Sequence, residues 1–306
     1  TAVEVDPAAL ELVRSTFSDF AGGLYQRPDV TLVLGEGRGY LQSHDRQFDL
    51  IQAPLSGSFT AAASGVYALN ESYLYTVEAF RLFLRRLTPE GVLSVTCWLK
   101  TPPRDSLKLF ATAVEALRRD GIADPGKHLV MIRSLNSATL VVSRAPLSGE
   151  DVAAVRGFCQ SRSFDPCYFP GVREDETNQY IQLSQGTVYY QATQALVSEN
   201  PEDFYEHYLF YVRPATDMRP YFFRFFKWST LPRLVKGMGV AWVPFVEWGY
   251  VALAATIVQA AVASAIFILA PLAVLGRSPA AKGFKRWVIV YFALLGIAYM
   301  FLEIVF

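Results

Sequence analysis

The hydrophobic positions in the first 150 residues alternate between two periods. Short apolar runs predict strands at 1–5, 30–34, 48–53, 91–98, 128–134 and 138–143. Apolar residues three and four positions apart predict helices at 7–20, 73–86 and 106–119. Strands that alternate with helices through short connections are typical of an α/β fold with a doubly wound sheet. Because such sheets bind ligands beyond the carboxyl ends of their strands, candidate site residues are expected there.

The hydrophobic pattern changes near the C-terminus. Residues 249–275 contain no charged residue, and residues 287–306 contain only Glu303. Because about 20 apolar residues suffice to cross a bilayer, we predict transmembrane helices at about 249–275 and 287–306. The alternative is a pair of buried core helices. Basic residues flank the first apolar run on both sides, so the positive-inside rule does not fix an orientation.

These patterns predict three parts. Residues 1–150 form a nucleotide-binding domain, 151–240 an aromatic-rich extension with a juxtamembrane segment, and 241–306 the two membrane helices. In the extension, aromatic side chains alternate with arginines over 201–228, which favours a membrane-interface segment over a surface that stacks nucleic-acid bases. Asp217 is expected to pair with Arg219 or with the nucleotide-binding domain. The chain starts within a strand pattern and ends inside an apolar run, so we expect a larger protein with sequence on both sides.

Composition narrows the function classes. The 306 residues carry 28 basic and 28 acidic side chains, which gives no bias toward nucleic acid. A mean hydropathy of +0.23 excludes a disordered chain. Three cysteines exclude a disulfide scaffold, and the spacing of Cys159 and Cys167 is no metal signature. We therefore expect neither a nucleic-acid partner nor a bound metal.

The first candidate residues lie at the end of the strand at 1–5. A carboxylate there can accept two hydrogen bonds from the vicinal hydroxyls of a ribose, which makes Glu4 a cofactor-binding candidate. Asp6 is a second candidate. Its alternative role is the N-cap of the helix that begins at Pro7.

Two further candidates follow the next two strands. In Gly35-Glu36-Gly37, the glycines allow close backbone approach to a ligand while Glu36 accepts hydrogen bonds; a plain tight turn is the alternative. Gln52 ends the strand at 48–53, and the loop after it contains no carboxylate.

The chain resembles the spermidine synthase (polyamine aminopropyltransferase) family, which has the class I methyltransferase-like, or Rossmann-like, fold. The matching segments are VEVDP at 3–7, LGEGRGYL at 34–41, RQFDLIQ at 46–52 and YLYTVEAFRLFLRRLTPEGVLSV at 73–95. Three more segments resemble the multi-spanning bacterial branch, in which the domain is fused to membrane helices: 63–80, TDMRPYFFRFFKW at 216–228 and MFLEI at 300–304.

The resemblance implies decarboxylated S-adenosylmethionine, or a related adenosyl nucleoside such as S-adenosylmethionine, as the ligand. Glu4 would hold the ribose, Glu36 with Gly37 would meet the adenine edge, and Asp6 and Gln52 would complete the cofactor site. The implied partners are a polyamine, a lipid bilayer and a second copy of the chain in a homodimer. The implied location is the bacterial inner membrane, with the soluble domain on the cytoplasmic side.

The sequence departs from the family pattern in two places. The glycine-rich loop after the family's first strand is missing, and the usual catalytic aspartate position falls in Pro54–Gly57, which has no acid. Aminopropyl transfer needs a deprotonated amine, so Tyr75 and Glu71 are the substitute catalytic candidates. Three functions stay open: a membrane-anchored spermidine synthase-like transferase, an S-adenosylmethionine-dependent methyltransferase, and a non-catalytic transporter or assembly subunit with a degenerate domain.

Overall fold

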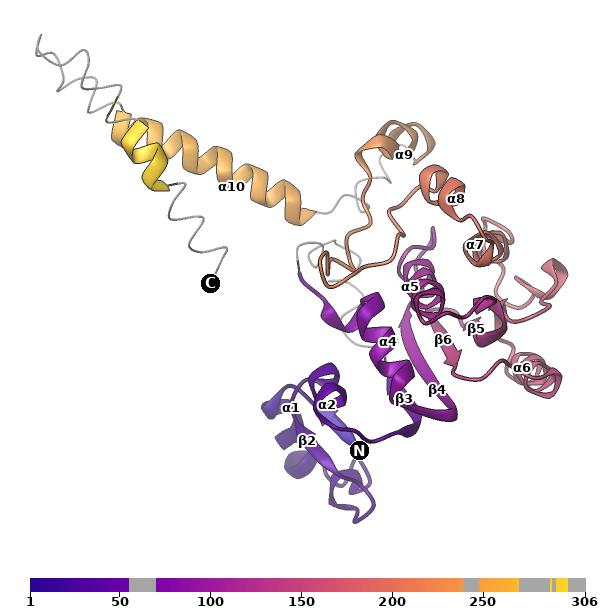
Figure 1. The fold of residues 1–306 in the computed structure, drawn as a ribbon. Helices are drawn as coiled ribbons and strands as arrows, with labels where there is room; N and C mark the ends of the chain where they lie inside the picture. Colours follow the sequence, from indigo (N-terminus) through magenta and orange to yellow (C-terminus); the bar gives the residue numbers. More distant parts are fainter. Residues whose placement is uncertain (55–69, 239–247, 270–286, 288–289, 297–306) are drawn as a thin grey trace, which may run out of the picture. The chain divides into compact units, whose positions relative to one another are not determined.

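A computed structural model describes residues 1–54, 70–238, 248–269, 287 and 290–296 (Figure 1). The chain divides into two compact units, Thr1–Tyr250 and Val251–Phe306, and each is described by itself. All candidate site residues of the sequence lie in the first unit.

The N-terminal part of the first unit is a small parallel sheet. Strand β1 (Ala2–Glu4) pairs with β2 (Leu32–Leu34), with Val3 opposite Val33. Helix α1 (Pro7–Glu11) follows β1, and α2 (Gly37–Ser43) follows β2. A 3₁₀ turn at Leu24–Gln26 precedes β2.

The helix predicted at 7–20 is shorter in the structure. After α1 the chain forms a π-helical turn at Leu12–Thr16. The Ser15 hydroxyl donates to the carbonyl of Glu11 at 2.8 Å, a local bond that competes with regular helix geometry. Leu12 and Phe17 are about half exposed, so burial of an apolar face does little to extend the helix.

A second sheet of five strands has the order β3-β4-β6-β5-β7. Its strands are β3 (Phe48–Ala53), β4 (Leu87–Trp98), β5 (Leu129–Arg133), β6 (Ser137–Ser143) and β7 (Asp165–Tyr168). β3 and β4 are parallel, whereas the pairs β4–β6, β5–β6 and β5–β7 are antiparallel. Strands and helices alternate as predicted, but the described strands form two sheets rather than one doubly wound sheet, and the larger sheet is parallel only between β3 and β4.

Helices carry the connections and the C-terminal extension of this unit (Figure 1). They are α4 (Val77–Arg85), α5 (Asp105–Arg119), α6 (Gly149–Arg162), α7 (Val188–Val197), α8 (Glu202–His207) and α9 (Leu231–Met238). Short 3₁₀ turns lie at Tyr73–Tyr75, Pro125–His128, Glu174–Glu176 and Trp228–Thr230. α5 contacts α4, α7, β4 and β6, so it is the central helix of the unit.

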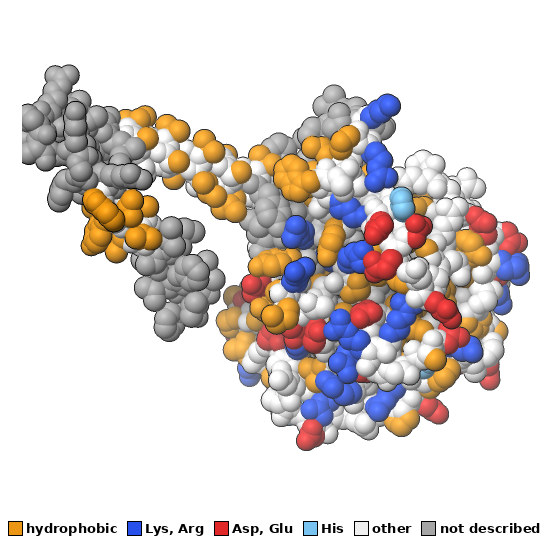
Figure 2. Space-filling view, turned by 45° about the horizontal axis from the view of Figure 1, so that its top comes forward, with side chains coloured by type: hydrophobic (Ala, Val, Ile, Leu, Met, Phe, Trp, Pro, Cys, Tyr) orange, Lys and Arg blue, Asp and Glu red, His pale blue; other side chains and the backbone are white. Residues whose placement is uncertain are grey.

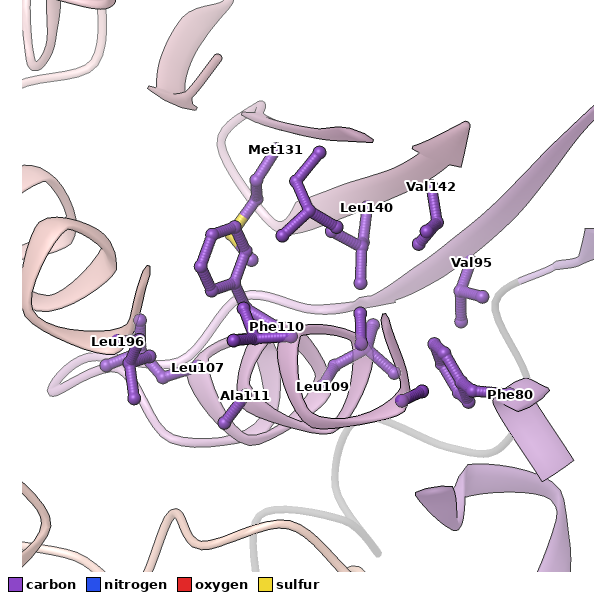
Figure 3. Close-up of a cluster of buried hydrophobic side chains, with 14 of the residues drawn as sticks. Phe80, Val95, Leu107, Leu109, Phe110, Ala111, Met131, Leu140, Val142 and Leu196 are labelled. Carbon is purple, nitrogen blue, oxygen red and sulfur yellow. The ribbon is translucent and has the colours of Figure 1, made fainter. Parts of the chain in front are cut away.

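The core lies between α5 and the five-stranded sheet (Figure 3). Leu107, Leu109 and Phe110 of α5 are almost completely buried. The side chains that surround them come from strands and from the two neighbouring helices: Phe80, Val95, Met131, Leu140, Val142 and Leu196. Burial of one such side chain contributes about 1.5–3 kcal/mol, so this cluster holds sheet and helices together.

The structure contradicts the prediction of transmembrane helices. Helix α10 (Trp248–Ser264) has 17 residues and continues as a π-helical segment at Ala265–Leu269. Among the residues that the structure describes, no helix is both long enough and apolar enough to cross a membrane. The α-helical part of this segment ends at Ser264, where the backbone hydrogen bonds change to the π-helical register. An apolar sequence window does not fix how far one regular helix continues.

Apolar side chains of α10 are exposed, as Figure 2 shows along that helix; Ile257 and Val258 are 60% and 62% exposed. Residues 270–275 of the first predicted span, and 288–289 and 297–306 of the second, lie outside the described residues.

Candidate functional site

A pocket of about 400 Å³ lies at the carboxyl ends of β1, β2 and β3, which belong to two different sheets. We call it the inter-sheet pocket, because its walls come from β1, the turn after β2, and β3, together with the 3₁₀ turn Tyr73–Tyr75. Five of the seven predicted site residues line it: Glu4, Glu36, Gly37, Gln52 and Tyr75. The rule that ligands bind at the carboxyl ends of strands therefore brings residues from four separate motifs to one cavity.

The two carboxylates near the end of β1 have different surroundings. Glu4 lines the pocket, and its Oε1 accepts a hydrogen bond from the backbone N–H of Asp6 at 2.9 Å. Asp6 does not line the pocket. Its Oδ1 accepts from the N–H of Ala8 at 2.8 Å, which is the N-cap alternative that the sequence allowed. A ligand contact by Asp6 stays a prediction.

Glu36 caps helix α2. Its two carboxylate oxygens accept from the N–H groups of Arg38 at 2.9 Å and Gly39 at 2.6 Å. Each oxygen keeps a further lone pair, so the cap does not exhaust the capacity of Glu36 to accept hydrogen bonds. Gly37 opens the helix beside it. The cap fixes the turn so that this carboxylate stays at the pocket wall.

The rest of the lining is mostly apolar. It includes Val3, Leu50 and Phe83, and Gln52 adds an exposed amide near the end of β3. The ring of Tyr75 lies 4.8 Å from that of Phe222, centroid to centroid. An apolar cavity with a few polar groups at one side is typical of a small-molecule site.

Glu71 lies away from this pocket. Its Oε2 accepts from the Tyr73 hydroxyl at 2.9 Å, and its Oε1 accepts from the Tyr221 hydroxyl at 3.4 Å. The bond to the Glu71 carboxylate raises the pKa of Tyr73. The structure therefore separates the two predicted catalytic residues. Pro54 lines the pocket, whereas the rest of the predicted aspartate position, 55–57, lies outside the described residues.

Beside the pocket lies an ion pair whose two partners the sequence did not identify. Arg38 donates to both carboxylate oxygens of Asp217, at 2.8 and 2.5 Å. Asp217 also accepts from the Thr76 hydroxyl at 2.7 Å, and Arg38 donates to the carbonyl of Tyr73 at 2.8 Å. Of the two expected partners for Asp217, the domain is observed and Arg219 is not. The hydrogen bonds from Arg38 lower the pKa of Asp217.

The Arg38–Asp217 pair joins three of the quoted motifs. Arg38 belongs to LGEGRGYL, Thr76 caps α4, and Asp217 belongs to TDMRPYFFRFFKW. The backbone N–H of Asp217 also donates to Glu78 at 2.9 Å. Because the pair fixes Tyr73 and the turn after β2 to one another, it positions two walls of the inter-sheet pocket. In the sequence, the TDMRP motif marked Asp217 as noteworthy, but the motif does not indicate which residue Asp217 binds.

The described residues contain neither a metal-ligand cluster nor a cysteine with a lowered thiol pKa. Within residues 1–54, 70–238 and the described C-terminal segments, no group of three or more His, Cys, Asp or Glu side chains is placed to hold a metal ion. Burial raises the pKa of the Cys97 and Cys167 thiols, which keeps them protonated and weakly nucleophilic.

Comparison with known proteins finds similarity over the first 104 residues, which include the pocket lining. Residues 1–104 match the model of the spermine/spermidine synthase domain. A polyamine aminopropyltransferase of Korarchaeum cryptofilum is 29% identical over 96 residues, which cover 31% of this chain and 27% of the relative. The chain thus spans about a quarter of the length of that relative.

Solved structures of spermidine synthases are also similar. The enzyme of Thermotoga maritima is 16% identical, with a TM-score of 0.32, over 67% of this chain and 58% of the other. A probable spermidine synthase of Corynebacterium glutamicum is 18% identical, with a TM-score of 0.34, over 50% of this chain and 51% of the other.

The matched residues and the pocket coincide. Every residue that lines the inter-sheet pocket, from Thr1 to Phe83, lies inside the matched range 1–104. The range that matches the spermine/spermidine synthase domain therefore contains the whole inter-sheet pocket.

Proposed function

We propose that the inter-sheet pocket binds an adenosyl nucleoside, decarboxylated S-adenosylmethionine or a close relative, and that the protein is a spermidine synthase-like transferase. One observation carries the proposal: Glu4, Glu36, Gly37, Gln52 and Tyr75 line the same cavity at the carboxyl ends of β1, β2 and β3. The match of residues 1–104 to the spermine/spermidine synthase domain supports the choice of nucleoside.

In this proposal each polar group of the pocket binds a different part of the nucleoside. Glu4 accepts hydrogen bonds from the two ribose hydroxyls, since a carboxylate offers two acceptor atoms at the spacing of a vicinal diol. Glu36, held by its cap to α2, accepts from the exocyclic amine of adenine. The apolar side chains of Val3 and Leu50 contact the faces of the base.

The transfer step assigned to the pocket is a displacement at carbon. The lone pair of a neutral amine attacks the aminopropyl carbon bound to the sulfonium. The carbon–sulfur bond breaks, its electron pair stays on sulfur as a thioether, and the amine nitrogen loses a proton. Tyr75 is the candidate for ordering the amine through its hydroxyl, because it lines the pocket and Glu71 does not, and the released proton passes to solvent.

Calorimetry on the 306-residue chain tests the binding. We expect methylthioadenosine and decarboxylated S-adenosylmethionine to bind, and Glu4→Gln to weaken binding about tenfold through the loss of a charge-assisted hydrogen bond. Glu11→Gln is the matched control, since Glu11 is exposed on α1 and does not line the pocket. Absence of binding to every adenosyl nucleoside would refute the proposal.

Two further measurements separate the alternatives. Tighter binding of S-adenosylmethionine than of its decarboxylated form would favour a methyltransferase. Nucleoside binding without aminopropyl transfer to putrescine would favour a non-catalytic domain that retains the pocket.

A further inference from the structure

A second and larger cavity lies on the other side of helix α5 from the sheet core. It has a volume of about 900 Å³ and is lined by α5, by residues 199–205 at α8, and by residues 211–224. We call it the α5–α8 cleft. Apart from α5, its walls come from the extension that follows the five-stranded sheet, outside the range that matches the spermine/spermidine synthase domain.

The lining of the cleft is unbalanced in charge. Six basic side chains and three acidic ones line it, although the whole chain is neutral. The basic residues are Lys108, Arg118, Arg119, Arg213, Arg219 and Arg224. On the face drawn in Figure 2, basic and acidic side chains are interspersed.

Two of the arginines are neutralised by carboxylates of the same cleft. Arg213 donates to both oxygens of Glu202, at 2.8 and 2.6 Å. Arg119 donates to Glu115 at 2.8 Å. Glu199 is the third carboxylate of the lining.

Arg118 is positioned without being neutralised. Its Nη2 donates to the backbone carbonyls of Val197 at 3.2 Å and Ser198 at 2.5 Å, and a carbonyl carries no net charge. Arg219 is exposed at the rim, and its backbone N–H donates to Thr216. Within the described part of the chain, neither guanidinium forms an ion pair at 4 Å or less.

Lys108 adds a charge at the floor of the cleft. Its side chain is 1% exposed, and its Nζ donates to the carbonyls of Tyr221 at 3.0 Å and Arg224 at 2.8 Å. The rings of Tyr211 and Phe225 lie 5.3 and 5.1 Å from this ammonium. These contacts fix the 211–224 segment over α5 and keep a positive charge beneath the cleft.

From this arrangement we infer that the α5–α8 cleft binds a small polyanion that carries at least two phosphate groups. A concave site lined by one sign of charge focuses its field on a ligand of the opposite sign. Guanidinium groups bind phosphate with paired hydrogen bonds, and Arg118 and Arg219 line the cleft without an ion pair to any described carboxylate. The same surplus repels a polyamine, so the cleft is not the acceptor site of the proposed transfer.

Inorganic tripolyphosphate is the probe, added to the 306-residue chain and followed by calorimetry. We expect saturable binding at low millimolar concentration or tighter, weakened at least about tenfold by Arg118→Ala with Arg219→Ala. Arg162→Ala is the matched control, because Arg162 is exposed at the end of α6 and does not line the cleft. The control is expected to change the affinity less than about twofold, as a distant exposed charge acts only through a screened field.

Three results would overturn the inference: no saturable binding, equal loss in the control variant, or tighter binding of spermidine than of tripolyphosphate. Unchanged urea unfolding of the double variant shows that lost binding is not lost folding. Lys108→Met is a second variant and should weaken binding in the same direction. Methylthioadenosine affinity is expected to be unaltered by Arg118→Ala with Arg219→Ala, so failure here is separable from failure of the nucleoside site.

Discussion

The inter-sheet pocket and the α5–α8 cleft lie in one folded unit and are assembled in different ways. The pocket is small, mostly apolar, and built within the first 83 residues from strand ends. The cleft is about twice as large, and basic side chains outnumber acidic ones in its lining. It is built from α5 and from a segment about a hundred residues later in the chain. Strand ends are located by a general topological rule, whereas the cleft depends on how the extension packs on α5.

The two cavities share structural supports, which makes them experimentally comparable. The Arg38–Asp217 pair ties the turn after β2 to the segment that also carries Thr216 and Arg219 of the cleft. Tyr221 lines the cleft and donates to Glu71, close to the turn that carries Tyr75. Substitutions in these supports should affect both cavities, and substitutions in a lining should affect one.

The largest effect is expected from the buried pair Arg133–Asp165, which joins β5 to β7. The two side chains are 2% and 0% exposed, and the Asp165 carboxylate also accepts from the N–H groups of Gln179, Tyr180 and Ile181. Asp165→Ala leaves a buried guanidinium and three amides without this acceptor. We expect it to lower the free energy of unfolding by about 3–5 kcal/mol, measured by urea denaturation, with loss of both ligands.

The exposed Asp19 supplies the control, since Asp19→Ala should leave the unfolding midpoint in place. Loss of only one ligand in Asp165→Ala would mean that the two cavities do not depend on a common core.

A smaller effect is expected from the Arg38–Asp217 pair. The Asp217 side chain is 35% exposed, so solvent screening reduces the contribution of the pair. We expect Asp217→Ala to lower the free energy of unfolding by about 1–2 kcal/mol and to weaken both methylthioadenosine and tripolyphosphate binding a few fold. Asp203→Asn, at a fully exposed position of α8, is the control. An effect confined to stability would assign the pair a role in folding and none in positioning.

The same pair predicts a pH dependence in acid. The hydrogen bonds from Arg38 lower the pKa of Asp217 in the folded protein below its value of about 3.9 in the unfolded chain. The stabilisation is therefore complete above about pH 5 and is lost as the pH falls through 3.9 toward the folded pKa. Measured by urea unfolding, the stability difference between the wild type and Asp217→Asn should shrink between about pH 6 and pH 3. A constant difference would contradict the assigned charge of Asp217.

The smallest effect is expected from Tyr75→Phe. The ring contact with Phe222 remains, so methylthioadenosine affinity should change less than about threefold. If the Tyr75 hydroxyl acts in transfer, kcat for aminopropyl transfer falls while the nucleoside affinity stays. Tyr180→Phe, at an exposed ring that lines neither cavity, is the matched control. An equal fall in affinity and kcat would make Tyr75 a binding residue only.

Local signals in the sequence located the strands and the polar residues that follow them. Glu4, Glu36 and Gln52 were predictable because ligand-binding residues of α/β folds lie at the carboxyl ends of strands. Helix α6 was missed because its sequence lacks an apolar stripe. It has a reciprocal cap between Ser148 and Asp151, and a search for capping residues would have found it.

Ion-pair partners required the folded chain. Asp217 pairs with Arg38 across 179 positions, and no periodicity or spacing encodes such a distance. The membrane prediction failed for a related reason. Mean hydropathy over 249–275 describes composition, whereas the length of α10 depends on where its backbone hydrogen bonds change register after Ser264.

The sequence alone determined the strands of the first part of this protein and the polar residues near their ends, because backbone preference and apolar periodicity act over a few residues. The tertiary structure decided that Glu71 faces tyrosines rather than the pocket, that Arg38 meets Asp217, and that unneutralised arginines gather over α5. Charges interact through space, so their partners are set by packing and not by their order along the chain.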